Sequence, residues 1–202
     1  PAGKFTIDSC CAEFVNDALW TYLSGGVNNE KVWIFDNGSY GFAAGEVTYA
    51  DPSTTEEWNN WSANWDPGVG HSGDDAIWES TMTFGLTGGA NVTVYNSSSQ
   101  STAVGTFMLN VDDHTITFTD CELLHTPSWS DRSTNWNRNL KLLELDENHM
   151  RIGVMRDNSE GPWWLVWNFV SKEYADNYVP EDRPDPEPAL PDGWEDMVSE
   201  VV

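Results

Sequence analysis

The chain has few basic residues. Nine Lys and Arg side chains stand against thirty-three Asp and Glu, and the formal net charge over 202 residues is −24. A surface this acidic repels nucleic-acid phosphates, anionic lipid headgroups and sulfated or uronic polysaccharides. Nucleic acid is therefore excluded as a partner.

Long apolar runs are also missing, since none approaches the roughly 20 residues that a membrane-spanning helix needs. The sequence begins with Pro and lacks a basic and apolar leader, so we expect a processed or excised part of a longer polypeptide. The length suits one domain with a real core and a short flanking segment. Low Lys content with abundant Asn, Ser, Thr, Gly and Trp favours an exported protein.

Cysteine and histidine are too scarce and too scattered for a recognisable metal or nucleophile motif. Cys10, Cys11 and Cys121 form no C-x-x-C pair, and the four histidines show no zinc spacing. One of the adjacent cysteines could bridge to Cys121, or all three could be buried as small hydrophobic residues. No G-x-S-x-G occurs, and no predicted strand carries two or three acids on one face, as two-carboxylate glycosidases of sandwich fold require. We therefore expect no enzymatic activity.

Tryptophan, by contrast, is abundant, with twelve residues. Four of them lie between 58 and 84, and the first three, Trp58, Trp61 and Trp65, have Asn, Ser and Asp as neighbours rather than aliphatic residues. Rings in such company are expected on a surface, where an indole face can stack on a sugar ring. The sugar hydroxyls then need polar partners, and His71 and Asp75 are candidates. The alternative is a satellite cluster of rings folded over the core.

A second polar segment with tryptophans, HTPSWSDRSTNWNR, covers 125–138. Trp129 and Trp136 are its candidate platforms, and Arg132 is a polar neighbour that could bind a sugar hydroxyl. Here too the rings could instead cover one end of the core. Both segments fall in long predicted connections, 45–78 and 122–138, which is where a binding site is expected.

A structural calcium ion is a further possibility near the first segment. Asp74 and Asp75 with Glu79 could supply carboxylate oxygens, although a plain polar turn explains the same residues and no dense D-x-D-x-D loop is present.

One short helix is predicted near the start of the domain. Apolar residues recur there at spacings of three and four, with Asp8 or Ser9 as N-cap and Gly25 and Gly26 as the end; they are Phe14, Val15, Ala18, Leu19 and Tyr22. Residues 1–8 are expected to be the end of a preceding strand or linker, residues 9–172 the folded domain, and residues 173–202 an acidic, Pro-rich tail.

The remainder of the domain shows strand patterns. Asn37-Gly38 predicts a hairpin between 31–36 and 39–44. Further alternating segments lie at 79–87, 90–96, 101–111, 114–121, 139–146, 149–157 and 163–170. About nine strands separated by turn signals, without helical periods between them, predict an all-β antiparallel sandwich. In the last strand the odd positions Trp163, Leu165, Trp167 and Phe169 form one apolar face and are expected in the core.

Several segments resemble one known family. FVNDALWTYLSGG, KVWIFDNGSYGFAAG, GDDAIWESTMTFGLTGG and LLELDENHMRIGVMRDNSEGPWWLVWNFV are similar to the carbohydrate-binding domain of SusE-like surface glycan-binding lipoproteins of Bacteroidetes polysaccharide-utilisation systems. The resemblance covers about residues 12–172. It implies a jelly-roll module without hydrolytic activity, one of several domains in a protein at the bacterial outer-membrane surface.

The function expected from the residues and the resemblance together is non-catalytic binding of a neutral β-glucan, most plausibly the β-1,3-glucan laminarin. The protein is expected to act as a monomer that stacks two or three indole faces on successive glucosyl rings. Two alternatives stay open, a β-glucan-hydrolysing sandwich enzyme and a protein-interaction or adhesion domain.

Overall fold

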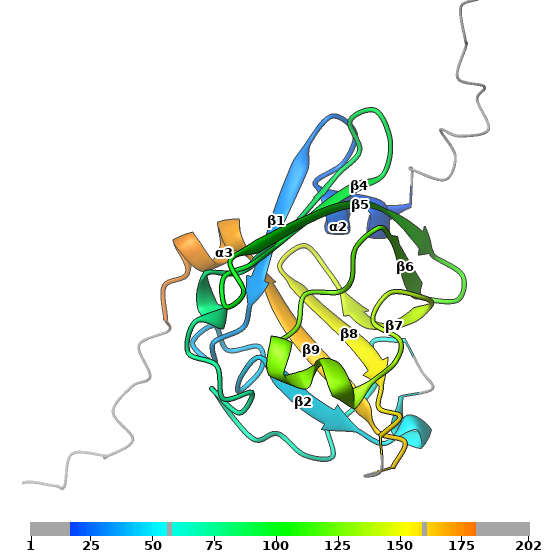
Figure 1. The fold of residues 1–202 in the computed structure, drawn as a ribbon. Coiled ribbons are helices and arrows are strands. Elements are labelled where there is room, and N and C mark those ends of the chain that lie inside the picture. Colours follow the sequence, from blue (N-terminus) through cyan, green and yellow to red (C-terminus); the bar gives the residue numbers. More distant parts are fainter. Residues whose placement is uncertain (1–16, 56–57, 159–160, 181–202) are drawn as a thin grey trace, which may run out of the picture.

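A computed structural model describes residues 17–55, 58–158 and 161–180, and it is built almost entirely of antiparallel strands (Figure 1). In chain order the elements are α2 (Ala18–Ser24), β1 (Glu30–Phe35), β2 (Val47–Ala50), η1 (Pro52–Thr54), η2 (Ile77–Glu79), β3 (Thr81–Gly85), β4 (Asn91–Asn96), β5 (Ser101–Asn110), β6 (Thr115–Thr119), η3 (Pro127–Arg132), β7 (Leu140–Leu145), β8 (His149–Met155), β9 (Trp164–Ser171) and α3 (Lys172–Asn177). Among the described helices none has the length and apolar character to cross a bilayer.

Eight strands close into a barrel. The hydrogen-bonded order is β1-β3-β4-β5-β6-β7-β8-β9, and β1 pairs back onto β9 through Trp33–Ser171, Ile34–Val170 and Phe35–Phe169. Apart from the omission of β2, each strand pairs with the next along the chain, which is an up-and-down connection. β2 is the ninth strand and pairs with the other half of β9, Trp164 to Trp167.

The all-β antiparallel prediction is confirmed, but the two-sheet jelly-roll arrangement is wrong. The reason is physical: a sandwich and a barrel both require alternation of period two along each strand, and only the partners of the first and last strands distinguish them. Here the end of β1 bonds to the end of β9, so a single sheet closes on itself.

The barrel interior is a packed core rather than an open channel. Interior-facing positions such as Phe35, Phe84, Phe118, Ile152 and Trp167 are all fully or almost fully buried. A small eight-stranded barrel has just enough room for such side chains. A ligand must therefore bind at an end or on the outside.

The predicted helix is present, with its C-terminal limit confirmed and its N-terminal limit different. α2 ends at Gly25, which takes the left-handed conformation (φ 78°) and donates its N–H to Thr21 O. Its N-cap is Asp17, whose side chain accepts from Leu19 N at 2.8 Å. Asp8, Ser9 and the first apolar positions lie outside the described residues. The buried Trp33 Nε1 donates to Leu23 O at 2.9 Å and thereby ties the helix to β1.

The hairpin predicted at Asn37-Gly38 does not form, because 39–44 is not a strand. Asp36 is fully buried, and its carboxylate accepts from Gly38 N at 2.8 Å and from Ala43 N at 2.9 Å. These bonds fold residues 36–46 into a loop, and β1 pairs with β3 and β9 instead.

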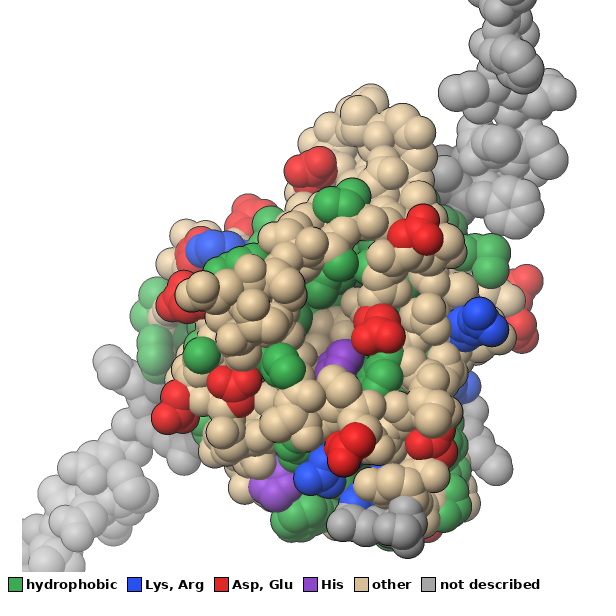
Figure 2. All heavy atoms as spheres, viewed as in Figure 1, with side chains coloured by type: hydrophobic (Ala, Val, Ile, Leu, Met, Phe, Trp, Pro, Cys, Tyr) green, Lys and Arg blue, Asp and Glu red, His purple; other side chains and the backbone are tan. Residues whose placement is uncertain are grey.

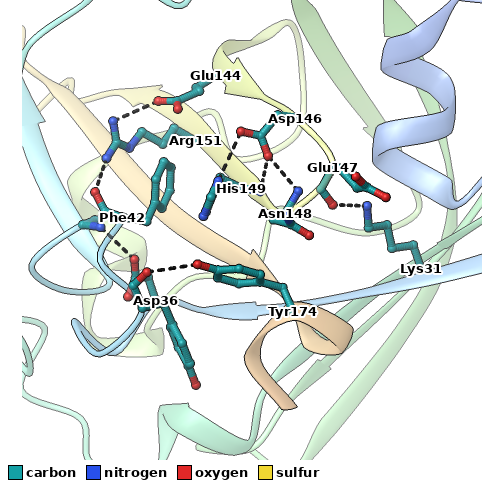
Figure 3. A network of polar contacts seen from close by, with 12 residues as sticks. Lys31, Asp36, Phe42, Glu144, Asp146, Glu147, Asn148, His149, Arg151 and Tyr174 are labelled. Carbon is teal, nitrogen blue, oxygen red and sulfur yellow. Dashed lines mark hydrogen bonds and ion pairs between the residues drawn. The ribbon is translucent and has the colours of Figure 1, made fainter. Parts of the chain in front are cut away.

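The same loop is held against the outside of the barrel by Arg151 of β8. Its guanidinium donates to Phe42 O at 2.8 Å and pairs with Glu144 at 2.9 Å, as Figure 3 shows. Its Cζ also lies 3.9 Å from the centre of the Phe42 ring. This loop leads directly into β2, so the contacts fix where β2 begins.

The described fold continues beyond the predicted domain limit at 172. Ser171 caps α3, and Tyr174 in this helix donates its hydroxyl to Tyr40 O at 3.3 Å. Residues 1–16 and 181–202, which include Cys10, Cys11 and the Pro-rich stretch, lie outside the described residues.

Candidate functional site

Three adjacent strands end together at one mouth of the barrel. Tyr49 of β2, Leu165 of β9 and Val154 of β8 share one interior-facing row, because Tyr49 pairs with Leu165 and Leu165 with Val154. The next interior-facing row holds Arg156 and Trp163, whose backbones are joined by a bond from Arg156 N to Trp163 O at 2.8 Å. Alternation therefore places a Tyr, an Arg and a Trp at the rim.

Trp65 is brought to this rim by a short extension of the sheet. Tyr49 N donates to Trp65 O at 2.8 Å, and Asn64 N donates to Tyr49 O at 2.9 Å, so the end of the first tryptophan segment pairs with the free edge of β2. Partners in an antiparallel bridge point to the same side, and the Tyr49 and Trp65 rings lie 4.8 Å apart. Trp65 stays 52% exposed, so part of its ring surface remains accessible to a ligand.

His71 is placed by a buried carboxylate at the start of β2. Glu46 is fully buried and accepts from Gly70 N at 3.0 Å and from Ser72 N at 2.8 Å. The intervening His71 ring meets the Trp65 ring edge-on, at 4.9 Å and 83°. Its Nε2 lies 3.4 Å from the Tyr49 hydroxyl oxygen.

The third part of the site comes from η3, which crosses this end of the barrel in front of β8 and β9 (Figure 1). Trp129 of η3 packs edge-on against both His71 and Trp167, at 5.6 Å in each case. Arg132, the last residue of η3, places its Cζ 4.0 Å from the centre of the Trp129 ring. A cation over an indole face is attracted by the ring quadrupole, which fixes the guanidinium at the mouth.

Together these residues surround a pocket of about 310 Å³, which we call the mouth pocket; its lining is Tyr49, Trp65, His71, Arg132, Arg156 and Trp163. Figure 2 shows basic and histidine side chains at the lower edge of the molecule, with apolar and acidic side chains close by. The volume lies at the small end of the range of about 300–1,000 Å³ that is usual for ligand pockets. It suits one or two sugar units.

Among the described residues, the charged side chains that line the mouth pocket are two arginines. Burial lowers the pKa of Arg156, and the nearby Arg132 charge acts in the same direction, yet a guanidinium stays charged in proteins. Burial raises the pKa of the Tyr49 hydroxyl, although both arginines oppose the change. Tyr49 is therefore a neutral hydroxyl able to donate or accept a hydrogen bond.

Of the eight residues predicted to bind ligand, the structure brings four together: Trp65, His71, Trp129 and Arg132. Trp58 lies elsewhere, half-buried and stacked on His114 at 4.0 Å and 7°. Trp61 packs on a small apolar cluster outside the barrel, with Arg151 Cζ 4.8 Å from its ring centre. Asp75 is exposed and does not line the mouth pocket.

Trp129 and Trp136 were expected on the surface, and this expectation is wrong. Each is only 4% exposed. Trp136 stacks on His125 at 3.8 Å and donates its Nε1–H to Ser133 O at 2.9 Å. The polar sequence around them misled because η3 turns the Trp129 ring inward and leaves Ser128, Ser130 and Asp131 outside, while Trp136, beyond η3, is held inward by its bonds and by the His125 ring. Trp129 contributes to the pocket by holding Arg132.

The calcium hypothesis receives no support from the geometry. Among residues 17–55, 58–158 and 161–180, no group of three or more His, Cys, Asp or Glu side chains is arranged to hold a metal ion. Asp74 instead accepts from Ala76 N at 3.1 Å, as in an ordinary polar turn. Cys121 is free and buried.

Sequence reasoning missed Tyr49, Arg156 and Trp163 as pocket residues. Trp163 was assigned to the core, and it does pack against the core as well as line the pocket. The available signal was the strand phase, since Arg156 follows Ile152 and Val154 at a spacing of two. This spacing identifies Arg156 as a pocket residue only when the strand pairing is known, because the pairing places Arg156 beside Trp163.

A larger hollow of about 770 Å³ lies between residues 38–41 and α3. It contains Tyr40, Tyr174 and Tyr178, but no charged side chain lines it among the described residues, and its lining ends at Pro180, the last residue before 181–202. The mouth pocket combines exposed ring faces with charge and is the better candidate.

Comparison with protein-family models finds none that matches this chain, and comparison with curated proteins finds no matching sequence. The geometry of the mouth pocket is therefore the basis on which a function can be inferred for this chain.

Proposed function

We propose that this domain binds a glycan without cleaving it, and that the mouth pocket is the binding site. The observation that carries the proposal is Trp65, an indole ring 52% exposed at the rim of a pocket whose other walls supply hydrogen-bonding groups. A pyranose ring has one apolar face and a rim of hydroxyls, which is the combination that such a pocket complements.

The resemblance to surface glycan-binding domains makes a neutral β-glucan of the laminarin type the first ligand to test. It also makes a multimodular protein at the outer-membrane surface part of the proposal. From the sequence, several tryptophans were expected to stack on successive sugar rings. We now propose that Trp65 alone does so, because the Trp58 ring stacks on His114 and the Trp61 ring lies under Arg151.

A binding role is favoured over hydrolysis at this pocket by its lining. Two-carboxylate hydrolysis requires a pair of acids about 5–10 Å apart across the scissile bond. The lining of the mouth pocket includes two arginines and a histidine but no carboxylate from the described residues.

The affinity expected for a single platform is low. Stacking of a flat ring on an aromatic side chain is worth about 1–3 kcal/mol, so with a few hydrogen bonds the dissociation constant should be near millimolar. Several such domains on one surface would raise the effective affinity through local concentration.

The test is a titration of tryptophan fluorescence and heat with a laminarin oligosaccharide, run on the wild type and two variants. Trp65→Ala should lose binding with an unchanged melting temperature, because the ring is half exposed. Trp61→Ala, from the same segment, is the matched control: it should keep binding and melt at a lower temperature. Binding retained in Trp65→Ala would contradict the assignment of the site. If no β-glucan binds, the partner has to be sought among other glycans and among proteins.

A further inference from the structure

The hollow of about 770 Å³ beside α3, which we call the tyrosine hollow, shares no lining residue with the mouth pocket. Three of its lining residues are tyrosines. Tyr40 comes from the loop after β1, Tyr174 from α3, and Tyr178 directly follows that helix. All three are half-buried, so each keeps part of its surface open to the hollow.

The loop that carries Tyr40 is fixed from within the fold. The buried Asp36 carboxylate accepts from backbone N–H groups on both sides of Tyr40, those of Gly38 at 2.8 Å and Ala43 at 2.9 Å. Gly38 has a φ of 78°, a conformation that glycine adopts without strain. Tyr174 donates its hydroxyl to Tyr40 O at 3.3 Å and so joins the loop to α3.

The three rings are inclined to one another and therefore form walls rather than a stack. The ring centres lie 5.6 Å apart at 81° for Tyr40 and Tyr178, 5.4 Å at 55° for Tyr174 and Tyr178, and 6.4 Å at 59° for Tyr40 and Tyr174. Because no two centres are more than 6.4 Å apart, one small group can lie within about 6 Å of all three. A flat sugar ring stacks on a single face, whereas inclined faces suit a compact, rounded group.

Negative charge lies close to these rings. Asp36 is fully buried beside Tyr174, as Figure 3 shows. Burial raises the pKa of the Tyr174 hydroxyl, and the charges of Asp36 and Asp146 act in the same direction. No basic side chain among the described residues lines the hollow. With a net charge of −24 on the whole chain, this environment attracts cations and repels anions.

The basic residues near the hollow are paired with carboxylates. The Arg151 guanidinium opposes the rise in the pKa of Asp36, and it is itself bonded to Glu144 at 2.9 Å. Lys172, in the first turn of α3, bonds to Asp176 at 2.7 Å. Neither arginine nor lysine therefore places its charge in the tyrosine hollow.

We propose that the tyrosine hollow binds a quaternary ammonium group, which lies against the rings of Tyr40, Tyr174 and Tyr178. The methyl groups on such a nitrogen leave it no N–H to donate, so its attraction to ring faces replaces hydrogen bonds. Choline and trimethylated lysine both carry this group. The inference is independent of glycan binding, because the mouth pocket is lined by other residues.

The experiment titrates choline and two comparison ligands into the full chain at about 0.15 M salt. One is the neutral alcohol with carbon in place of the choline nitrogen, which keeps the shape and removes the charge. The other is ethanolamine, which keeps the charge and removes the methyl groups. We expect choline to bind in the millimolar range and on the order of tenfold more tightly than either comparison ligand.

Amide NMR locates the bound choline. The backbone signals of Gly41 and Val179 should shift on titration, because both residues line the tyrosine hollow. Phosphocholine and a trimethyllysine peptide, titrated in the same way, distinguish a lipid headgroup from a modified protein as the source of the group. Saturable binding of either at these signals supports the inference.

Tyr178→Leu is the diagnostic variant, and Tyr95→Leu, at a 36% exposed tyrosine of β4 outside the hollow, is its matched control. The first should weaken choline binding on the order of tenfold, and the second should not change it. Tyr178→Phe restores a ring face without the hydroxyl and should recover most of the lost affinity. A loss as large in Tyr178→Phe as in Tyr178→Leu would overturn the role of the ring.

Three results with the wild type would also overturn the inference. Equal affinity for the neutral alcohol would show that shape and apolar contact suffice. Equal affinity for ethanolamine would show a general attraction of cations to an acidic surface. Choline shifts at the Trp65 indole N–H instead of at Gly41 and Val179 would place the cation in the mouth pocket. Each of these results leaves the glycan proposal to be decided by its own titration.

Discussion

Replacing Gly45 by Ala should disrupt the loop that carries His71. A Cβ atom at position 45 would lie 2.6 Å from Gly68 O, 2.7 Å from Gly68 C and 2.8 Å from Val69 N. All three are backbone atoms, so no side-chain rotation can relieve the overlap. A van der Waals contact between carbon atoms without overlap needs about 3.5 Å or more. The backbone at 68–69 would therefore have to move away by roughly 1 Å.

The expected cost follows from this displacement. Overpacking in a well-packed region usually destabilises by about 1–3 kcal/mol, and in a domain of this size each kcal/mol lowers the melting temperature by about 2–4 °C. The retreat of residues 68–69 also stretches the bonds from Gly70 N and Ser72 N to the buried Glu46 carboxylate. Faster hydrogen exchange at these two amides should therefore accompany a melting temperature lower by roughly 3–10 °C.

Gly153→Ala is the control, since its added Cβ would meet side-chain atoms of Trp164 and Leu143 at 3.2–3.5 Å on the outside of the barrel. We expect a small stability change and unaltered exchange at Gly70 and Ser72. A Gly45→Ala variant that melted like the wild type and protected both amides equally well would show that the 68–69 backbone accommodates the added methyl group.

Two other predictions concern buried titratable groups. Burial lowers the pKa of His125 below the ordinary value of 6.5. As the pH falls through 6.5, His125 is therefore protonated in the unfolded chain while it stays neutral in the folded chain. The free energy of unfolding should therefore decrease between pH 7 and pH 5.5, and urea unfolding should show a smaller decrease in His125→Phe. Burial raises the pKa of Cys121 to about 11; peptide mapping after iodoacetamide treatment at pH 8 should find this thiol unmodified in the folded protein and modified in urea, and modification of the folded protein would contradict its burial.

The strands and the end of the helix could be predicted from the sequence because both depend on neighbours along the chain. Alternation marked eight of the nine strands, and Gly25 marked where α2 ends. The ninth strand, β2, was missed, since four residues show too few alternations to stand out within a long polar connection. Closure of the barrel was missed because it depends on the pairing of β1 with β9, which local patterns do not record.

Only the part of the candidate site that depends on neighbours along the chain could be predicted from the sequence. Trp65 and His71 stood out because aromatic and polar residues cluster in a segment without strand pattern. Their partners Tyr49, Arg156 and Trp163 come from the ends of β2, β8 and β9, and these meet through the strand order β8-β9-β2, which local patterns do not record. The buried rings Trp129 and Trp136 show the limit of inferring exposure from neighbours in sequence. In η3 a short helical turn buries Trp129 and exposes the polar residues beside it.

One edge of β9 is shared by two strands, β1 and β2, and this division affects which parts of the domain can vary. One half of this edge pairs with β1 and closes the barrel, while the other half pairs with β2, which supports Tyr49 and the segment that carries Trp65 and His71. Closure of the barrel and support of the mouth pocket thus use separate halves of one strand. The described residues between 47 and 76 contribute no strand to the ring of eight, so the strand pairs that close the barrel do not depend on the segment that carries Trp65 and His71.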